Sequence, residues 1–427
     1  MTGPHPEPAR AFPAELRARL QELYRHFHAH PELSMTEHAT AARVVGEVRG
    51  LLSASGLSHD VYEGIAGTGV VVVLRNGPGP TVLLRADLDG LPVREETGLP
   101  YASRATGRAK SGATVPVMHA CGHDVHITCL LGAVEVLVTA PRAWAGTVVA
   151  VFQPAEEADN GAEAMVAAGL TDLAPRPDVA FGQHVMPGAA GTVQVSAGPV
   201  MAACDDMRIR FHGRGGHGSQ PHLTIDPVLM AASFVVRVQS VVSRHVDPRQ
   251  AAVVTVGHLA AGAKNNVIPD SSLVELTVRT YDQETRDRMV GRIAAMARAE
   301  AAAVGAPEPE VEVFDSLPVT DNDAATTQRV RGALAAEFGG AAVLPMAPRS
   351  GSEDFSVLPG AWGTPYCYWG LGGFDASKWR AAEARGTAGA EFPGNHAATF
   401  APVEHPTLET GVRALVAATM AWLGTGE

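Results

Sequence analysis

The sequence has 427 residues, of which 46% are hydrophobic and 18% are charged, so the chain is long enough for two folded domains. A net charge of −12 argues against non-specific binding to nucleic acid or to anionic membranes. No apolar run has the length of a membrane span, and residues 1–11 lack the apolar core of a signal peptide. The four cysteines lack disulfide-framework spacing, which favours a reducing cytoplasm.

The first part of the chain predicts helices and strands in alternation. Apolar residues recur at helical spacing over Pro13–His30, and a second helix is expected over Met35–Ser55. The β-branched runs Val70–Leu74 and Thr81–Arg85 flank an Asn-Gly-Pro-Gly-Pro segment, which predicts a hairpin. The later apolar run Val125–Val138 predicts a buried helix. This alternation is typical of α/β folds.

Buried strands are expected to end in polar residues that can serve a site. Asp87 and Asp89 follow the second strand of the predicted hairpin, where they can contact a metal, hold a ligand imidazole, or only cap the next turn. The strand after the central helix leads into Glu156 and Glu157, and the next strand ends in His184. Because sites in α/β sheets gather at the carboxyl ends of strands, we expect these side chains to converge.

The densest group of metal-binding side chains extends from His119 to His126, just before and within the buried helix. Cys121 and His123 are two residues apart, so they cannot share one face of a helix and are expected in the loop that enters it. A helix N-terminus lowers the pKa of a thiol, so we expect Cys121 to ionise and bind metal readily. The competing interpretation is a reduced core cysteine beside capping histidines.

Glu156 and Glu157 are expected to point in opposite directions, because side chains alternate along a strand. Glu157 would then bind metal and Glu156 would act as general base toward a water; the competing interpretation is a solvated acidic pair. Together with Cys121, His123, His184 and a distant histidine, Glu157 makes too many ligands for one tetrahedral catalytic zinc. The set fits two ions roughly 3.5–4 Å apart that share a bridging water and the Cys121 thiolate.

From about Ala203 the pattern changes to half-exposed strands that alternate in polarity. The expected elements are a strand at Met207–Phe211, a helix at Pro227–Arg244, strands at Ala252–Leu259 and Leu273–Thr280, and a helix at Asp282–Val304. They predict a compact βαββα unit at residues 204–318, inserted into a first domain made of residues 1–203 and 319–427. The predicted fold class is therefore α/β, with a mixed sheet flanked by helices, plus a smaller inserted α+β domain.

Four sequence blocks carry a resemblance to a known family. The blocks are His119–His126, Gln153–Glu157, Gly182–His184 and Gly215–Gly218, and further similarity extends from Leu23–Leu33 to Asn395-His396. They resemble the amidohydrolase branch of the aminoacylase/carboxypeptidase metallopeptidase superfamily, which includes hippurate hydrolases, N-acyl-amino-acid amidohydrolases and auxin-conjugate hydrolases. The resemblance implies a catalytic domain with two divalent metals and an inserted domain that serves as a lid and commonly as a dimer interface.

The resemblance also implies roles for individual residues. Metal ligands are implied at Cys121, His123, Glu157, His184 and His396. The general base is implied at Glu156. Many relatives have a His-x-Asp ligand pair where this chain has Asp87-Leu88-Asp89, which agrees with the amidohydrolase branch and leaves the role of Asp87 open. His405 is the alternative to His396.

The inserted domain is expected to complete the site. In relatives, a histidine of the glycine-rich loop reaches a neighbouring subunit's metal centre and stabilises the oxyanion. His217 is the first choice for this role and His222 the second; alternatively, either one only bonds the loop backbone. Asn266 and Arg279 resemble the family's binding site for a substrate carboxylate, although a strand-end arginine is more often a surface residue. Glu353 lies in a loop that resembles a substrate-positioning loop.

A cluster of aromatic residues precedes His396 in the sequence. Its members are Trp362, Tyr366, Tyr368, Trp369, Phe374 and Trp379. They form either the wall of an acyl pocket, which would favour a bulky or aromatic acyl group, or an ordinary buried core. The sequence supports the two interpretations equally.

The sequence thus predicts a cytoplasmic, metal-dependent amidohydrolase that cleaves small N-acyl amino acids to a carboxylic acid and a free amino acid. Two divalent ions per subunit are expected, zinc or manganese, with cobalt and nickel as alternatives. A homodimer or higher homo-oligomer is expected through the inserted domain. The alternatives are a dipeptidase or aminobenzoyl-glutamate-type peptidase of the same superfamily, and a non-catalytic metal-containing binding protein.

Overall fold

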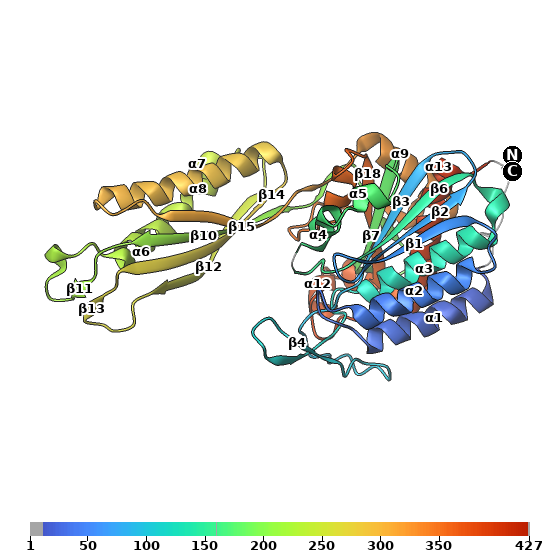
Figure 1. The fold of residues 1–427 in the computed structure, drawn as a ribbon, viewed down its shortest axis with the longest axis horizontal. Coiled ribbons are helices and arrows are strands. Elements are labelled where there is room, and N and C mark those ends of the chain that lie inside the picture. The colour runs from blue at the N-terminus through green and yellow to red at the C-terminus, as the bar shows by residue number, and fades with distance from the viewer. Residues whose placement is uncertain (1–11, 159, 426–427) are drawn as a thin grey trace. The chain divides into compact units, whose positions relative to one another are not determined.

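The computed structural model describes residues 12–158 and 160–425, which form two compact units (Figure 1). Unit 1 extends to Gly198 and includes residues 322–347 and the chain from Asp354 onward, whereas unit 2 consists of Pro199–Asp321 and Pro348–Glu353. The expectation about residues 1–11 lies outside the described residues. Among the described residues, no helix has the length and apolar character needed to cross a membrane.

Unit 1 is built on an eight-stranded mixed sheet of order β1-β2-β6-β3-β7-β18-β8-β17 (Figure 1). Its strands are β1 (Ser58–Ile65), β2 (Gly69–Asn76), β3 (Thr81–Asp87), β6 (Gly146–Gln153), β7 (Val179–Ala189), β8 (Val193–Gln194), β17 (Val343–Leu344) and β18 (Tyr366–Phe374). The strands β6, β3, β7 and β18 are parallel neighbours. They are apolar on both faces and almost entirely buried, as is typical of parallel sheets covered by helices.

The predicted hairpin between β2 and β3 is wrong. Strand β6 lies between them, antiparallel to β2 and parallel to β3. The turn residues after β2 do reverse the chain, but they do not determine which strand occupies the neighbouring position. The observed hairpin in this region joins β1 to β2, and it does not correspond to any strand pair predicted from the sequence.

Helix α3 is the central helix of unit 1 and packs on β3 and β7, while α1, α2 and α13 pack against α3. It is apolar on nearly all sides, which is typical of a buried helix, and its predicted existence is confirmed, as is that of α1 and α2. The helices of unit 1 are α1 (Ala14–Ala29), α2 (His38–Leu52), α3 (His123–Thr139), η1 (Pro141–Ala143), α4 (Gly161–Ala167), α5 (Leu170–Leu173), α9 (Ala324–Phe338), η3 (Gly340–Ala342), α10 (Val357–Gly360), α11 (Ala376–Ala384), α12 (Ala388–Glu391) and α13 (Glu404–Leu423). A short hairpin joins β4 (Thr106–Arg108) to β5 (Thr114–Pro116).

Unit 2 has its own core between an antiparallel sheet of order β12-β14-β10-β15 and two helices, α6 and α8. Its elements are β10 (Ala203–His212), β11 (Gly216–His217), η2 (Pro221–Leu223), α6 (Pro227–Val238), α7 (Ser240–His245), β12 (Ala252–Ala261), β13 (Val267–Ile268), β14 (Ser271–Thr280), α8 (Gln283–Ala303) and β15 (Glu310–Leu317). The expected βαββα order is present, but β15 was not predicted and adds a strand beside β10. Where the chain enters and leaves unit 2, β9 (Gly198–Met201) pairs with β16 (Thr320–Asn322).

Candidate metal centre

Cys121 and His123 lie on either side of Gly122, at the start of α3. Gly122 has a positive φ of 88° and caps the helix that begins at His123. A Cβ atom at Gly122 would lie 2.4 Å from Cγ1 of Val185, so glycine is required by both the backbone angle and the available space. The turn places Cys121 and His123 in a buried position.

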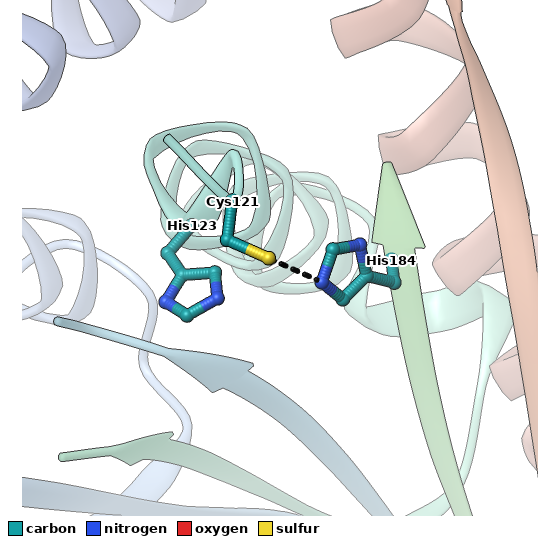
Figure 2. Close-up of side chains that lie close together, drawn as sticks. All are labelled: Cys121, His123 and His184. Carbon is teal, nitrogen blue, oxygen red and sulfur yellow. Dashed lines mark hydrogen bonds between the residues drawn. The ribbon is translucent and has the colours of Figure 1, made fainter. Parts of the chain in front are cut away.

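His184 comes from the middle of β7 and faces Cys121 (Figure 2). Its Nδ1 lies 2.8 Å from the carbonyl oxygen of Val185, so Nδ1 carries the proton and donates this hydrogen bond. Nε2 is left with its lone pair and lies 3.3 Å from the Cys121 Sγ. The thiol and the imidazole therefore lie where two donors to one ion would lie.

The ring of His123 lies among four carboxylates, those of Asp87, Asp89, Glu156 and Glu157. Its Nδ1 donates a hydrogen bond of 3.2 Å to Oδ1 of Asp89. Its Nε2 is buried without a hydrogen-bond partner in the described part of the chain. This atom lies 3.8 Å from Oε2 of Glu156 and 3.8 Å from Oε1 of Glu157. Both glutamates thus approach the same nitrogen, and the prediction that they point in opposite directions is wrong.

The reason is that the strand ends before the two glutamates. Strand β6 ends at Gln153, and Ala155 has a φ of 51°, so the alternation of a strand does not continue. The backbone N–H groups of Glu156 and Glu157 instead donate to Asp89, to Oδ1 at 3.2 Å and Oδ2 at 3.0 Å respectively. Asp89 therefore fixes both the glutamate loop and the imidazole of His123.

His396 reaches the same group of side chains from the loop that precedes α13. Its Nε2 lies 3.1 Å from Oε1 of Glu157. The alternative, His405, instead places its Nδ1 3.2 Å from Oε1 of Glu409 on α13. The structure thus brings His396, and not His405, to Glu157.

Two further histidines are buried nearby, and one of them uses both ring nitrogens elsewhere. The backbone N–H of Val185 donates to Nε2 of His126 at 2.9 Å, so Nδ1 of His126 carries the proton and donates to Asp87 at 2.6 Å. His126 therefore has no nitrogen left for a metal, and Asp87 holds this second imidazole. His119 donates from Nδ1 to the carbonyl oxygen of Asp89 at 3.1 Å.

The electrostatic environment of Cys121 differs from the one expected. Burial raises the pKa of the Cys121 thiol well above its usual value, and the carboxylates of Glu157 and Glu156 raise it further. The expectation of a lowered pKa is therefore wrong, because desolvation and two negative charges outweigh the helix N-terminus. Burial, and next the neighbouring His126, lower the pKa of His184 and keep it neutral. A bound divalent cation would instead lower the pKa of the Cys121 thiol, because coordination displaces its proton.

Among the groups of donor atoms that are compact enough to hold an ion, two share Cys121. Cys121, His123 and His184 form one group, and Cys121, Glu157 and His396 form the other, with the donor atoms of each group within 4.8 Å of one another. Cys121 belongs to both groups. The buried, unpartnered Nε2 of His123 is what a metal ligand leaves when its ion is removed. These residues therefore fit a pair of divalent ions.

In unit 2, the glycine-rich loop places the segment of His217 beside that of Asn266. His217 lies in β11, which pairs with β13, and the N–H of Gly218 donates to the carbonyl oxygen of Asn266 at 2.9 Å. Nδ1 of His217 lies 2.7 Å from the hydroxyl of Ser219. His222 lies in η2, and both histidines are exposed.

Arg279 and the loop that contains Glu353 also meet within unit 2. Arg279, near the end of β14, is half-buried and donates from Nη1 to the hydroxyl of Ser352 at 2.6 Å. Glu353 follows directly and is buried. The arginine therefore contacts the loop predicted to position the substrate, and it is not a freely exposed surface residue.

The aromatic cluster is divided between core and periphery. Tyr368 and Trp369 of β18 are fully buried, and the indole N–H of Trp369 donates to Oε1 of Gln183 at 3.2 Å. Trp379 is partly buried and stacks on Phe374, with the ring centroids 6.2 Å apart. The core interpretation therefore holds for Tyr368 and Trp369.

Comparisons with known proteins identify the family of the chain. The sequence matches the family model described as Peptidase family M20/M25/M40 over residues 83–383. The chain belongs to this family. Among its relatives, N-acetyl-L-cysteine deacetylase of Bacillus subtilis (strain 168) is 37% identical over 354 residues, which cover 81% of this chain and 80% of the relative. Hippurate hydrolase of Campylobacter jejuni is 40% identical over 274 residues, which cover 64% of this chain and 67% of the relative.

A solved structure supports the same assignment. A dinuclear metal-binding peptidase of the M20 family from Bacillus subtilis superimposes with a TM-score of 0.75 and 28% identity, over 95% of this chain and 98% of that chain. The family resemblance predicted from the sequence blocks is confirmed, and this M20 chain is a hydrolase of the amidohydrolase type. The alternative of a non-catalytic binding protein is therefore set aside.

One role in this M20 chain was not predicted from the sequence. Asp89 was recognised as a candidate to hold an imidazole, but its hydrogen bonds to the glutamate loop were not anticipated. The missing information was the order of the strands. Because β3 and β6 are parallel neighbours, the carboxylate after β3 lies beside the loop after β6.

Proposed function

We propose that this chain hydrolyses the amide bond of N-acyl amino acids and releases a carboxylic acid and a free amino acid. The observation that supports this most is the pair of donor groups sharing Cys121, with the Glu156 carboxylate 3.8 Å from His123 and in neither of these two groups, although it forms a further group with His123 and Glu157. A carboxylate beside the ligands, and not needed as one of them, is suited to proton transfer. The names of two relatives, a deacetylase of N-acetyl-L-cysteine and a hippurate hydrolase, support the substrate class.

In this proposal the metal ligands are Cys121, His123, Glu157, His184 and His396. Two divalent ions held there would polarise a carbonyl group and make a water molecule more acidic. Glu156 accepts the proton of the attacking water on its carboxylate and passes it to the nitrogen of the leaving amine. Thiolate and imidazole donors favour zinc, with manganese as the second choice. The assignment of His217 to the oxyanion and of Arg279 to the substrate carboxylate stays a prediction, as do the cytoplasmic location and the lid role of unit 2.

The test replaces Glu156 by Gln, which keeps the shape of the side chain and removes the base. E156Q should retain two ions per chain and lose about 10²- to 10⁴-fold in kcat. E157Q is the matched control, because the same change at the neighbouring position removes a ligand and should lower the metal content as well. A fully active E156Q would contradict the proposal.

The substrate class is tested with the metal-loaded wild-type protein. Acetyl and benzoyl amino acids should be hydrolysed faster than dipeptides and aminobenzoyl-glutamate. A preference for dipeptides or aminobenzoyl-glutamate would favour the alternative of a peptidase of the same superfamily.

We also propose a homodimer formed through unit 2. Strand β12 is an edge of its sheet, pairing among the described residues with β14 on one side, and Val253 and Leu259 on it are exposed. On α6, Leu229 and Val236 are exposed to 62% and 76%. An edge strand with exposed apolar side chains favours pairing with a second copy. Light scattering should give the mass of a dimer, and V236K should shift it toward the monomer; a monomeric wild-type protein would contradict the proposal.

A further inference from the structure

Asn395 directly precedes His396 and connects two other parts of the centre. Its Nδ2 donates one hydrogen bond to the carbonyl oxygen of Cys121 and one to the carbonyl oxygen of Val185, both at 3.1 Å. The backbone N–H of His396 donates to the carbonyl oxygen of Ala120 at 2.8 Å. Residues 395–396 are therefore attached to the loop before α3 and to β7 at the same time.

The Val185 carbonyl has a second role. It also accepts the hydrogen bond from Nδ1 of His184, at 2.8 Å, which turns Nε2 of that ring toward Cys121. Asn395 therefore binds the carbonyl group of one candidate ligand, Cys121, and the carbonyl group that orients another, His184. One side-chain amide thus sets the spacing of three ligand positions.

His396 depends on such attachments more than the other candidate ligands. Its side chain is 55% exposed, so packing does little to hold it. Its backbone has a φ of 71°, a conformation that residues other than glycine rarely adopt and that persists when neighbouring contacts impose it. In contrast, the ring of His123 is buried and bonded to Asp89.

We propose that Asn395 is a positioning residue of the metal centre, which holds His396 at a fixed position relative to Cys121 and His184. The inference rests on the proposed function, because it requires that these three residues bind metal. It implies that the ion bound by Cys121, Glu157 and His396 depends on Asn395 more strongly than the ion bound by Cys121, His123 and His184.

The chain offers a matched control for this proposal. Nδ2 of Asn76 also donates to two backbone carbonyl oxygens, those of Pro141 and Trp144, both at 2.6 Å. Asn76 is the last residue of β2 and belongs to neither donor group. The substitutions N395D and N76D therefore remove equivalent hydrogen bonds and place a carboxylate against two carbonyl oxygens in each case.

The experiment titrates Zn²⁺ into the metal-free full-length protein in competition with a chromophoric chelator and measures both dissociation constants. N395D should weaken the binding of one of the two ions by about 10- to 100-fold, the usual effect of removing a partner that orients a metal ligand. The affected ion should be the one that H396A also weakens. N76D should leave both constants as in the wild-type protein, even if it lowers the midpoint of thermal unfolding.

Several results would overturn the inference. Wild-type affinities in N395D would do so, and so would equal weakening in N395D and N76D, because that would indicate a general loss of stability. If N395D does not fold, the smaller pair N395S and N76S is compared in the same way. A wild-type protein that binds fewer than two ions would contradict the proposed function itself, and that result is seen before any variant is made.

Discussion

The histidines of unit 1 and those of the glycine-rich loop of unit 2 are held in different ways. In unit 1, His123, His126 and His184 are buried, and each bonds through Nδ1 to a carboxylate or to a backbone carbonyl. In unit 2, His217 and His222 are exposed, and Nδ1 of His217 bonds to Ser219, two residues away.

Burial and hydrogen bonds to residues distant in the sequence determine which ring nitrogen of each unit 1 histidine can bind a metal. In unit 1, the hydrogen bonds of Nδ1 at His123 and His184 leave Nε2 available to a metal, and the bonds of His126 exclude it from that role. Within residues 12–158 and 160–425, the side chains of His217 and His222 have no such hydrogen bond to a residue distant in the sequence. We therefore expect substitutions of the buried histidines of unit 1, or of the carboxylates bonded to them, to affect folding or metal binding, and substitutions of the loop histidines to affect turnover alone.

The largest effect is expected at His28, a buried histidine of α1 in unit 1. Its Nδ1 lies 2.7 Å from Asp124, and its Nε2 lies 2.9 Å from Glu95. Burial alone would lower the pKa of His28, but the hydrogen bonds that its ring donates to Asp124 and Glu95 raise it from 6.5 to about 10. Because the folded pKa is raised, its contribution to stability is complete below about pH 6.5 and is lost as the pH rises toward 10.

The free energy of unfolding of H28Q should therefore be about 3–5 kcal/mol lower than that of the wild-type protein at about pH 6, since the substitution leaves two buried carboxylates without a cation. The difference should shrink as the pH approaches about 10. Urea unfolding across this range measures it. The exposed His59 of β1 provides the control H59Q, which should follow the wild-type curve. Parallel pH profiles for H28Q and the wild-type protein would contradict the expectation.

The second-largest effect is expected at His217, in the glycine-rich loop of unit 2. If His217 stabilises an oxyanion, H217A should lower kcat by about 10²- to 10³-fold. Because the loop histidines are outside both donor groups, the metal content should not change. H222A is the matched control and should have the smaller effect. A larger loss of kcat in H222A than in H217A would assign the oxyanion to His222. A loss of metal in H217A would contradict the expectation that the loop histidines affect turnover alone.

The smallest effect is expected at Asp89. D89N keeps the size of the side chain but weakens its hydrogen bonds with the ring of His123 and with the backbone of Glu156 and Glu157. The affinity for metal should fall by about 10- to 100-fold. Chelator competition measures it, with the half-buried, ion-paired Asp60 of β1 giving the control D60N. Unchanged affinity would show that the glutamate loop does not need Asp89.

These features differ in how far the sequence could predict them. Helices α1 and α3 and the strands that lead to Glu157 and His184 follow from local periodicity, and so does the approach of their polar ends. The insertion of β6 between β2 and β3 could not be predicted, because local turn residues do not specify long-range pairing.

The errors within the candidate site have the same origin. The direction of Glu156 depends on the backbone of Ala155 and on Asp89, and the raised pKa of Cys121 depends on burial and on carboxylates distant in the sequence. Local pattern identified the residue types, whereas their protonation and direction are set by tertiary structure.

The candidate ligands lie on both sides of the inserted unit. Cys121, His123, Glu157 and His184 precede residue 199, whereas His396 follows residue 354. During synthesis on the ribosome, all of unit 2 must therefore emerge before the last ligand can join the others. Completion of the candidate centre is then a late event of biogenesis, whereas the nascent first segment already carries a cysteine and two histidines that can capture an ion.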